Sequence, residues 1–170
     1  MKKEYIIPIF VPHLGCPHNC IFCNQKKISG QTKMVTEKDV EETIEYYLKN
    51  FKDDNKYVEV AFFGGSFTAI EKEKQEELLK AVQKYIEDKK VNSIRISTRP
   101  DAIDKDILKM LKKYHVKTIE LGVQSMNNYI LKRSERGHTV EDVKKASKLI
   151  RWHGFILGHQ MMVGLPESTK

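Results

Sequence analysis

Short apolar runs alternate with amphipathic stretches along the whole chain, and this alternation limits the possible folds more than any other feature. The runs are rich in Val, Ile and Phe, which is typical of strands buried in a parallel sheet. They are Tyr5–Val11, Tyr57–Phe63, Ser93–Thr98, Val116–Val123 and Phe155–Val163. The stretches between them carry apolar residues at helical spacing. Such a βαβ series predicts an α/β fold with parallel pairing and right-handed crossovers.

Local signals mark where the expected helices begin. Thr36 with Asp39, and Thr139 with Asp142, have the spacing of a capping box, in which each residue satisfies the other's backbone N–H. Asp104 is suited to cap a third helix. These caps predict helices between the apolar runs.

The length of 170 residues sets the number of β/α units. A closed eight-unit barrel takes about 250 residues, so this chain has room for about five and a half units. We expect residues 1–170 to form one domain, an open or partial barrel that stops after its fifth strand. The sixth strand and any C-terminal domain are then expected in a longer protein. The alternative is a short natural protein with a frayed tail.

Composition excludes several classes of protein. The content of 40% hydrophobic residues excludes a disordered chain. No stretch approaches the roughly 20 apolar residues of a membrane span. The first residues run into a strand pattern without a signal-peptide core. These features favour a cytoplasmic protein.

All three cysteines, Cys16, Cys20 and Cys23, follow the first expected strand, at the edge where barrel enzymes place their chemistry. An odd, clustered set argues against a secreted disulfide scaffold. The spacing lets one loop place three soft thiolates around an iron–sulfur cluster or zinc. A [4Fe–4S] cluster usually takes four thiolates, so three would leave one iron open.

Two other interpretations of the cysteine loop stay open. His13 or His18 is placed to complete a structural zinc site with the three thiolates. The three cysteines are also compatible with reduced residues that bind no metal.

The pattern Cys16-x-x-x-Cys20-x-x-Cys23, with Phe22 before the third cysteine, resembles the signature of the radical S-adenosylmethionine (SAM) superfamily. The resemblance implies a partial (β/α)6 barrel whose three cysteines hold a [4Fe–4S] cluster. It further implies that SAM binds the fourth iron. Reduction then cleaves SAM to methionine and a 5′-deoxyadenosyl radical. Phe22 is counted among the cofactor-binding residues on this ground.

Two further motifs end the second and third strands. Gly64 and Gly65 let the backbone approach a ligand, or form a tight turn. The resemblance implies that they bind the amino group of SAM. Ser97 and Arg99 offer a hydroxyl and a guanidinium to a ribose or carboxylate, or belong to a helix-entry turn. We expect both to contribute to the SAM site.

The ends of the fourth and fifth strands supply the remaining candidates. Taken alone, Arg136 is typical of a solvated surface charge, but the resemblance implies that Gln124 and Arg136 contact SAM. Gln160 stands where coproporphyrinogen oxidases have an acidic residue, and we expect it at the ribose. The backbone at Gly164 is expected beside adenine by the same resemblance. No residue is assigned to catalysis.

The motifs at these strand ends are similar to those of Elongator catalytic subunits and oxygen-independent coproporphyrinogen oxidases. The resemblance implies an enzyme with an external electron donor, modifying the wobble uridine of tRNA. The net charge of +7 is compatible with a polyanion, although scattered lysine pairs are typical of any solvated surface. The alternatives are a porphyrin or other small-molecule substrate, a catalytically incomplete fragment, and a zinc-stabilised, non-catalytic module that binds RNA or a protein partner.

Overall fold

Five parallel strands form one sheet in the order β1-β2-β3-β4-β5. The computed structural model describes residues 2–12, 20–23, 34–53 and 55–168. The strands are β1 (Lys3–Val11), β2 (Lys56–Gly64), β3 (Ser93–Thr98), β4 (Val116–Gln124) and β5 (Ile156–Met161). Each strand pairs with the one before it in sequence, so the predicted α/β partial barrel is confirmed.

The helices begin where the capping signals predict. Thr36 and Asp39 form a complete capping box, as do Thr139 and Asp142, and Asp104 accepts from the backbone of the next helix. The helices are α2 (Glu37–Asn50), α3 (Lys72–Glu87), α4 (Lys105–Lys113), α5 (Asn128–Arg133) and α6 (Val140–Trp152), with short 3-10 turns η2 (Phe67–Ala69) and η3 (Pro100–Ala102). The short helix α5 is not among the predicted elements.

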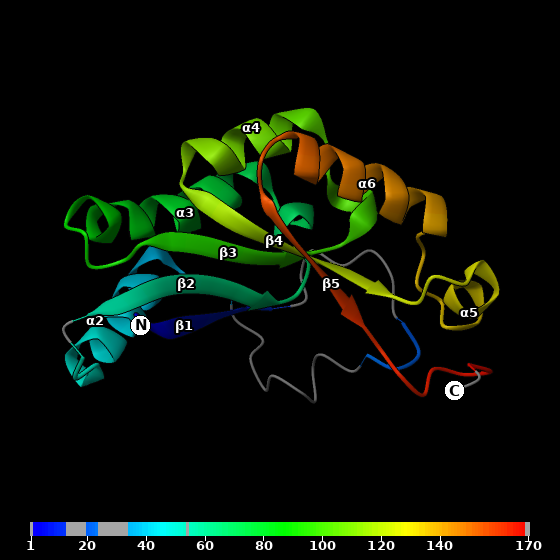
Figure 1. Ribbon diagram of the computed structural model, residues 1–170, viewed down its shortest axis with the longest axis horizontal. Helices are drawn as coiled ribbons and strands as arrows, with labels where there is room; N and C mark the ends of the chain where they lie inside the picture. The colour runs from blue at the N-terminus through cyan, green and yellow to red at the C-terminus, as the bar shows by residue number, and fades with distance from the viewer. Residues whose placement is uncertain (1, 13–19, 24–33, 54, 169–170) are drawn as a thin grey trace.

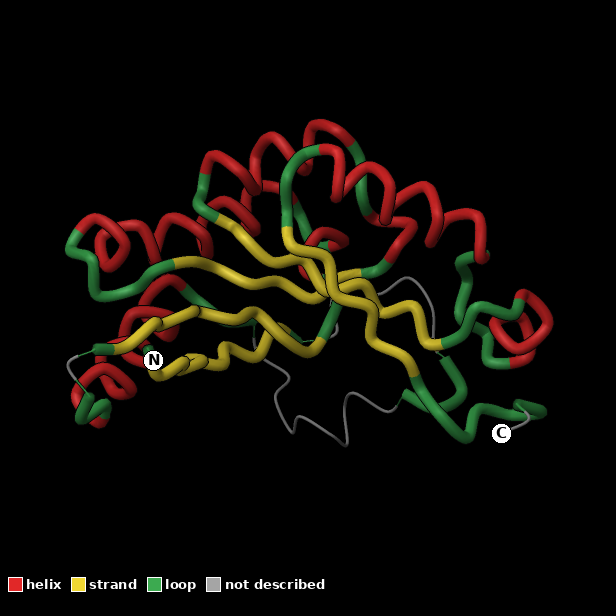
Figure 2. The backbone as a smooth tube through the Cα atoms, in the orientation of Figure 1, coloured by secondary structure: helices red, strands yellow, loops and turns green. Residues whose placement is uncertain are grey.

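One face of the sheet packs against helices. Figure 1 shows α3, α4 and α6 on the same side of the sheet, and α2 packs beside α3. Ile94 and Ile96 of β3 are fully buried in this layer. Because successive side chains of a strand point to opposite faces, Arg95 and Ser97 project from the other face. No helix of the described residues covers that face (Figure 2).

The strands all point to one edge, where the predicted site residues gather. Helix α5 and the segment of residues 20–23 lie at this edge (Figure 1). The ends of β1 and β2 are joined there, because Gly65 N donates to Val11 O at 2.8 Å. No helix among the described residues is long and apolar enough to cross a membrane.

Candidate functional site

Gly64 requires glycine for two reasons. Its φ of +102° is rarely adopted by other residues. A Cβ there would also lie 2.6 Å from Cζ of Phe10 and 2.7 Å from the carbonyl oxygen of Val11. Gly64 and Gly65 therefore make the sharp turn that the sequence allows, with exposed backbone at Gly64. Their contact with SAM stays a prediction.

Two of the three cysteines lie in the described part of the chain. Cys20 is buried and Cys23 half-buried, and Cys23 N donates to Cys20 O at 2.9 Å, which closes a turn between them. Half-buried Phe22 lies within that turn. The neighbouring Ile21 N donates to Ser134 O at 3.3 Å, which fixes this turn against the chain that follows α5.

The rest of the expected ligand set lies outside the described residues. Cys16 belongs there, as do His13 and His18, the two candidates for a zinc site. Within the described ranges, no three His, Cys, Asp or Glu side chains are placed to hold one metal ion. The identity of the metal therefore stays a prediction.

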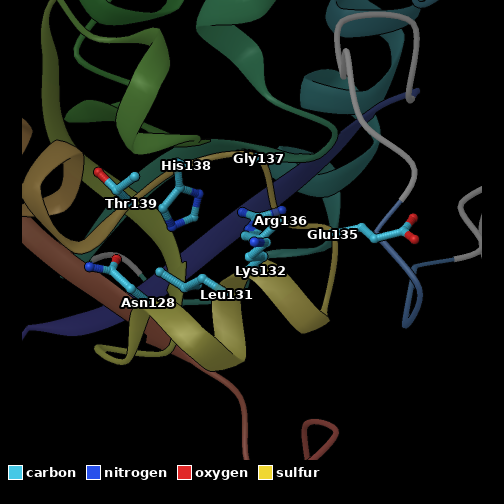
Figure 3. A pocket seen from close by; sticks show the side chains of 8 residues that line it. All are labelled: Asn128, Leu131, Lys132, Glu135, Arg136, Gly137, His138 and Thr139. Atoms are coloured by element: carbon cyan, nitrogen blue, oxygen red, sulfur yellow. The ribbon is translucent and has the colours of Figure 1, made fainter.

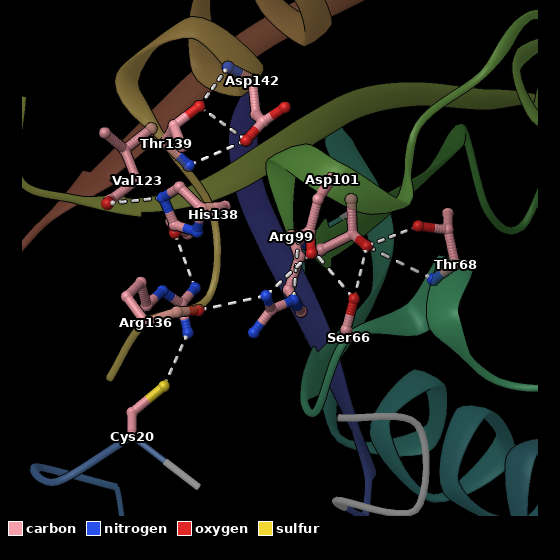
Figure 4. Close-up of polar contacts among 12 residues, drawn as sticks. Cys20, Ser66, Thr68, Arg99, Asp101, Val123, Arg136, His138, Thr139 and Asp142 are labelled. Atoms are coloured by element: carbon pink, nitrogen blue, oxygen red, sulfur yellow. Dashed lines mark hydrogen bonds and ion pairs between the residues drawn. The ribbon is translucent and has the colours of Figure 1, made fainter. Parts of the chain in front are cut away.

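Arg136 joins the cysteine turn to the end of β4. Its Nη1 donates to Sγ of Cys20 at 3.4 Å, and its Nη2 donates to the carbonyl oxygen of Gly122 at 2.6 Å (Figure 4). The side chains of Gln124 and Arg136 both lie beside Gly122. A Cβ added to Gly122 would be 3.3 Å from Gln124 Nε2 and 2.6 Å from Arg136 Nη2. The structure thus brings Gln124 and Arg136 together beside a cysteine.

Arg99 is buried behind Arg136. Its guanidinium donates to both carboxylate oxygens of Asp101, at 2.9 and 2.8 Å, and its Nη2 donates to Arg136 O at 3.1 Å (Figure 4). Only 2% of Arg99 is exposed. These contacts place Arg99 as a support for the backbone of Arg136, and its expected contact with SAM stays a prediction.

Three hydroxyl groups behind this site form a cluster that the sequence analysis missed. Thr98 Oγ1 lies 2.8 Å from Ser66 Oγ and 2.5 Å from Thr68 Oγ1, and Arg99 N donates to Ser66 Oγ at 3.2 Å. The cluster joins the ends of β2 and β3. The signal for it was the hydroxyl residues Ser66 and Thr68 shortly after one predicted strand and Thr98 at the end of the next.

His138 is the buried histidine of the site. Its Nε2 lies 3.2 Å from the carbonyl oxygen of Val123, which can only accept, so Nε2 carries the proton. Burial, followed by the positive charges of Arg136 and Arg99, lowers the pKa of His138 to about 4. His138 is therefore neutral at pH 7.

Four buried polar atoms at this site have no hydrogen-bond partner among the described residues. They are Arg99 Nη1, Ser134 Oγ, Arg136 Nε and His138 Nδ1. Arg136 and His138 also line a hollow of about 570 Å³ beside α5 (Figure 3). Buried donors and acceptors are normally satisfied, so this part of the molecule suits a polar ligand or ordered water.

Ser97 and Gln160 meet on the helix-free face. Gln160 Nε2 donates to Oε2 of Glu120 at 2.8 Å and to Ser97 Oγ at 3.4 Å. Glu120 of β4 was not among the predicted site residues. Gly164 follows β5 with a φ of +77° and no described atom within 4 Å of an added Cβ. The roles of Ser97, Gln160 and Gly164 toward SAM stay predictions.

The fold and this edge define a class of protein: an α/β partial barrel with a cysteine-bearing turn packed at the carboxyl ends of parallel strands. The model of the radical SAM superfamily matches residues 10–170. The chain therefore belongs to the radical SAM superfamily.

Relatives fall in both branches that the sequence resembles, since an oxygen-independent coproporphyrinogen-III oxidase-like protein, HemZ of Bacillus subtilis, stands among them beside a tRNA uridine(34) acetyltransferase. A tRNA uridine(34) acetyltransferase of Methanocaldococcus infernus is 31% identical over 66% of this chain and 24% of its own length. An uncharacterized protein of Methanocaldococcus jannaschii is 33% identical over 99% of this chain and 55% of its own length. The chain thus spans about a quarter of the length of the acetyltransferase and about half of the length of the uncharacterized protein.

Solved structures share the fold. Elp3 of Methanocaldococcus infernus superposes with a TM-score of 0.71 at 25% identity, over 99% of this chain and 40% of that one. Coproporphyrinogen III oxidase (HemN) of Escherichia coli, a radical SAM enzyme, gives 0.68 at 20% identity, over 99% and 39%. The tRNA uridine(34) acetyltransferase and HemN are enzymes, as expected for this chain.

Proposed function

We propose that this chain is the cofactor-binding part of a radical SAM enzyme, with Cys16, Cys20 and Cys23 as ligands of a [4Fe–4S] cluster. The observation that supports it best is the contact of Arg136 with the sulfur of Cys20 at the carboxyl edge of the sheet. Thiolates are the ligands that iron–sulfur clusters prefer. The donor set and the cationic partner of Cys20 both fit a cluster held by thiolates.

The surrounding residues would bind and orient SAM. The cluster, when bound, supplies the electron that cleaves SAM to methionine and a 5′-deoxyadenosyl radical. Gly64 and Gly65 offer backbone groups to the amino group of SAM. We infer that Gln124 and Arg136 bind its carboxylate, because a guanidinium matches a carboxylate in shape and charge. Neutral His138 adds no positive charge beside Arg136 at pH 7.

For the substrate we propose tRNA, with the wobble uridine as the modified base. The tRNA uridine(34) acetyltransferase among the relatives and the net charge of +7 support this choice. An external donor would supply the electron. The second candidate is a porphyrin or another small molecule, because HemN shares the fold.

The metal content is the first test. After anaerobic purification, we expect about four irons and four sulfides per chain and almost no zinc. One zinc without sulfide, persisting after reconstitution with iron and sulfide, would reject the radical enzyme in favour of a zinc-stabilised module.

Cleavage of SAM is the second test. The reconstituted protein, reduced with dithionite, should convert SAM to 5′-deoxyadenosine and methionine. The protein before reconstitution is the control and should form neither. A complete cluster without any SAM cleavage would indicate a catalytically incomplete fragment.

The substrate class needs a separate measurement. Binding of tRNA should weaken as salt rises, because phosphate contacts release counterions. Deuterium transfer into 5′-deoxyadenosine from tRNA labelled at uridine would then identify the substrate. Transfer from a labelled porphyrinogen, with none from tRNA, would support the second candidate.

A further inference from the structure

A row of polar side chains crosses the helix-free face of the sheet from β2 to β5. Its members are Glu59, Ser93, Arg95, Ser97, Thr118, Glu120 and Gln160. Charged groups on a sheet face lose hydration, so they persist where they are paired. This row is therefore a built feature of the barrel interior, and its last members lie near the predicted SAM site.

Arg95 fixes the position of Glu120. Its Nε donates to Glu59 Oε2 at 2.7 Å and its Nη1 donates to Glu120 Oε1 at 2.6 Å. Glu59 is 5% exposed, so the far end of the row is well buried. One oxygen of Glu120 is thus held by Arg95, and the other, Oε2, is directed at β5.

Glu120 in turn fixes the orientation of the Gln160 amide. A carboxylate can only accept hydrogen bonds, so the NH₂ group of Gln160 must face Oε2 of Glu120, at 2.8 Å. The same NH₂ group lies 3.4 Å from Ser97 Oγ. The carbonyl oxygen Oε1 is then turned away from both, and no described residue donates to it.

We propose that Glu120 is a positioning residue that presents Oε1 of Gln160 as a hydrogen-bond acceptor to a sugar hydroxyl of the bound nucleoside. This inference rests on the proposed function, because SAM carries the ribose. Gln160 is exposed and lies near the carboxyl end of β5, at the edge where we expect this ligand. The Gln160 amide has a donor end and an acceptor end. Because the Glu120 carboxylate binds the NH₂ end, the carbonyl oxygen is the end that faces the ligand.

The test is the affinity for S-adenosylhomocysteine, which is not cleaved, measured by calorimetry on the anaerobically reconstituted protein. Gln160→Leu removes the acceptor and should weaken binding by about 3- to 10-fold, the usual worth of one hydrogen bond. Glu120→Gln lets the two amides pair in either orientation, so it should weaken binding by about 3-fold or less. Gln160→Glu sets two carboxylates side by side and should also weaken binding.

The double variant that exchanges the side chains of residues 120 and 160 gives the decisive result. In the double variant Glu120→Gln with Gln160→Glu, an amide again donates to a carboxylate, and affinity should return to within about twofold of the parent. The 2′-deoxy and 3′-deoxy analogues of S-adenosylhomocysteine each lack one sugar hydroxyl. The analogue that lacks the hydroxyl bound by Gln160 should have the same affinity for every variant as for the parent. Thermal unfolding of each variant shows that it is folded.

His159→Gln is the matched control, because His159 precedes Gln160 on β5 and its Nε2 instead contacts Ser147 of α6 at 2.8 Å. It should leave the affinity unchanged. Parent-like affinity in Gln160→Leu, or a double variant no better than Gln160→Glu, would overturn the inference while the proposed function stands. A parent protein with a full cluster that binds no S-adenosylhomocysteine would reject both.

Discussion

Nη1 of Arg136 donates to Sγ of Cys20 at 3.4 Å, although the two residues are 116 positions apart. The same guanidinium is anchored on Gly122 O, and the backbone of Arg136 is anchored by Arg99. The cation at the cysteine is therefore held from two sides. We therefore expect Arg136 to act on the proposed cluster as well as on SAM.

Arg136→Gln should lower the reduction potential of the cluster, because it removes a positive charge and a hydrogen bond from a ligand sulfur. Iron affinity should fall by about 10-fold or more, as for other partners of metal ligands. The potential is measured by a redox titration followed by electron paramagnetic resonance. Arg133→Gln is the control, since Arg133 is exposed and pairs with Glu167. An unchanged potential in Arg136→Gln would contradict the prediction.

Cys20→Ser should abolish cluster binding while much of the barrel stays folded. Serine has nearly the same shape, and Cys20 contributes little to the apolar core between sheet and helices. Iron content and visible absorbance report the cluster, and circular dichroism reports the fold. Ser134→Ala, beside the same turn, should keep the cluster. A full brown chromophore in Cys20→Ser would show that Cys20 is not a ligand.

The stability of the protein should fall as pH drops from about 6.5 to about 4, because of His138. Its folded pKa of about 4 lies below the ordinary 6.5, so the unfolded chain takes up the proton first. The difference corresponds to roughly 3 kcal/mol of unfolding free energy, present above pH 6.5 and lost through this window. Urea unfolding at several pH values measures it.

His138→Gln isolates this contribution, because the other titrating groups remain. The free-energy difference between parent and variant should shrink as the pH falls from 6.5 to 4. A difference that is independent of pH across this window would show that His138 is protonated equally in both states.

Gly64→Ala should destabilise the protein by more than about 2 kcal/mol, since it adds both strain and a clash with Phe10 and the backbone of Val11. Gly164→Ala has the same kind of backbone strain without a neighbour, and should cost about 1 kcal/mol. Urea unfolding of the two variants gives the comparison. Equal losses would show that the contacts with Phe10 and with the backbone of Val11 both relax without cost.

Much of the fold was predictable because its signals are local. The capping pairs, Thr36 with Asp39 and Thr139 with Asp142, determine where two helices start, and the apolar runs determine the strands. Helix α5 escaped prediction because its six residues are too few to show a helical period. Its start depends on Asn127, whose side chain accepts from Tyr129 N.

The site was predictable at the level of motifs and not of contacts. The motifs placed Gln124 and Arg136 at one edge, and the structure brings them together. The pairing of Arg95 with Glu120 depends on the register between β3 and β4, which shifts between Ile94 and Arg95 and cannot be read from either strand alone. The burial of Arg99 likewise depends on Asp101 and the distant Arg136.

The contact between the cysteine turn and residues 134–136 has a consequence for biosynthesis. The cysteines leave the ribosome early, whereas Ser134 and Arg136, which hold their turn, are made more than a hundred residues later. The thiols therefore wait, without their final supports, until four strands and α5 have been synthesised. We therefore expect the iron–sulfur assembly machinery to deliver its cargo only after residue 136 has been synthesised, when β1 to β4 can already pair.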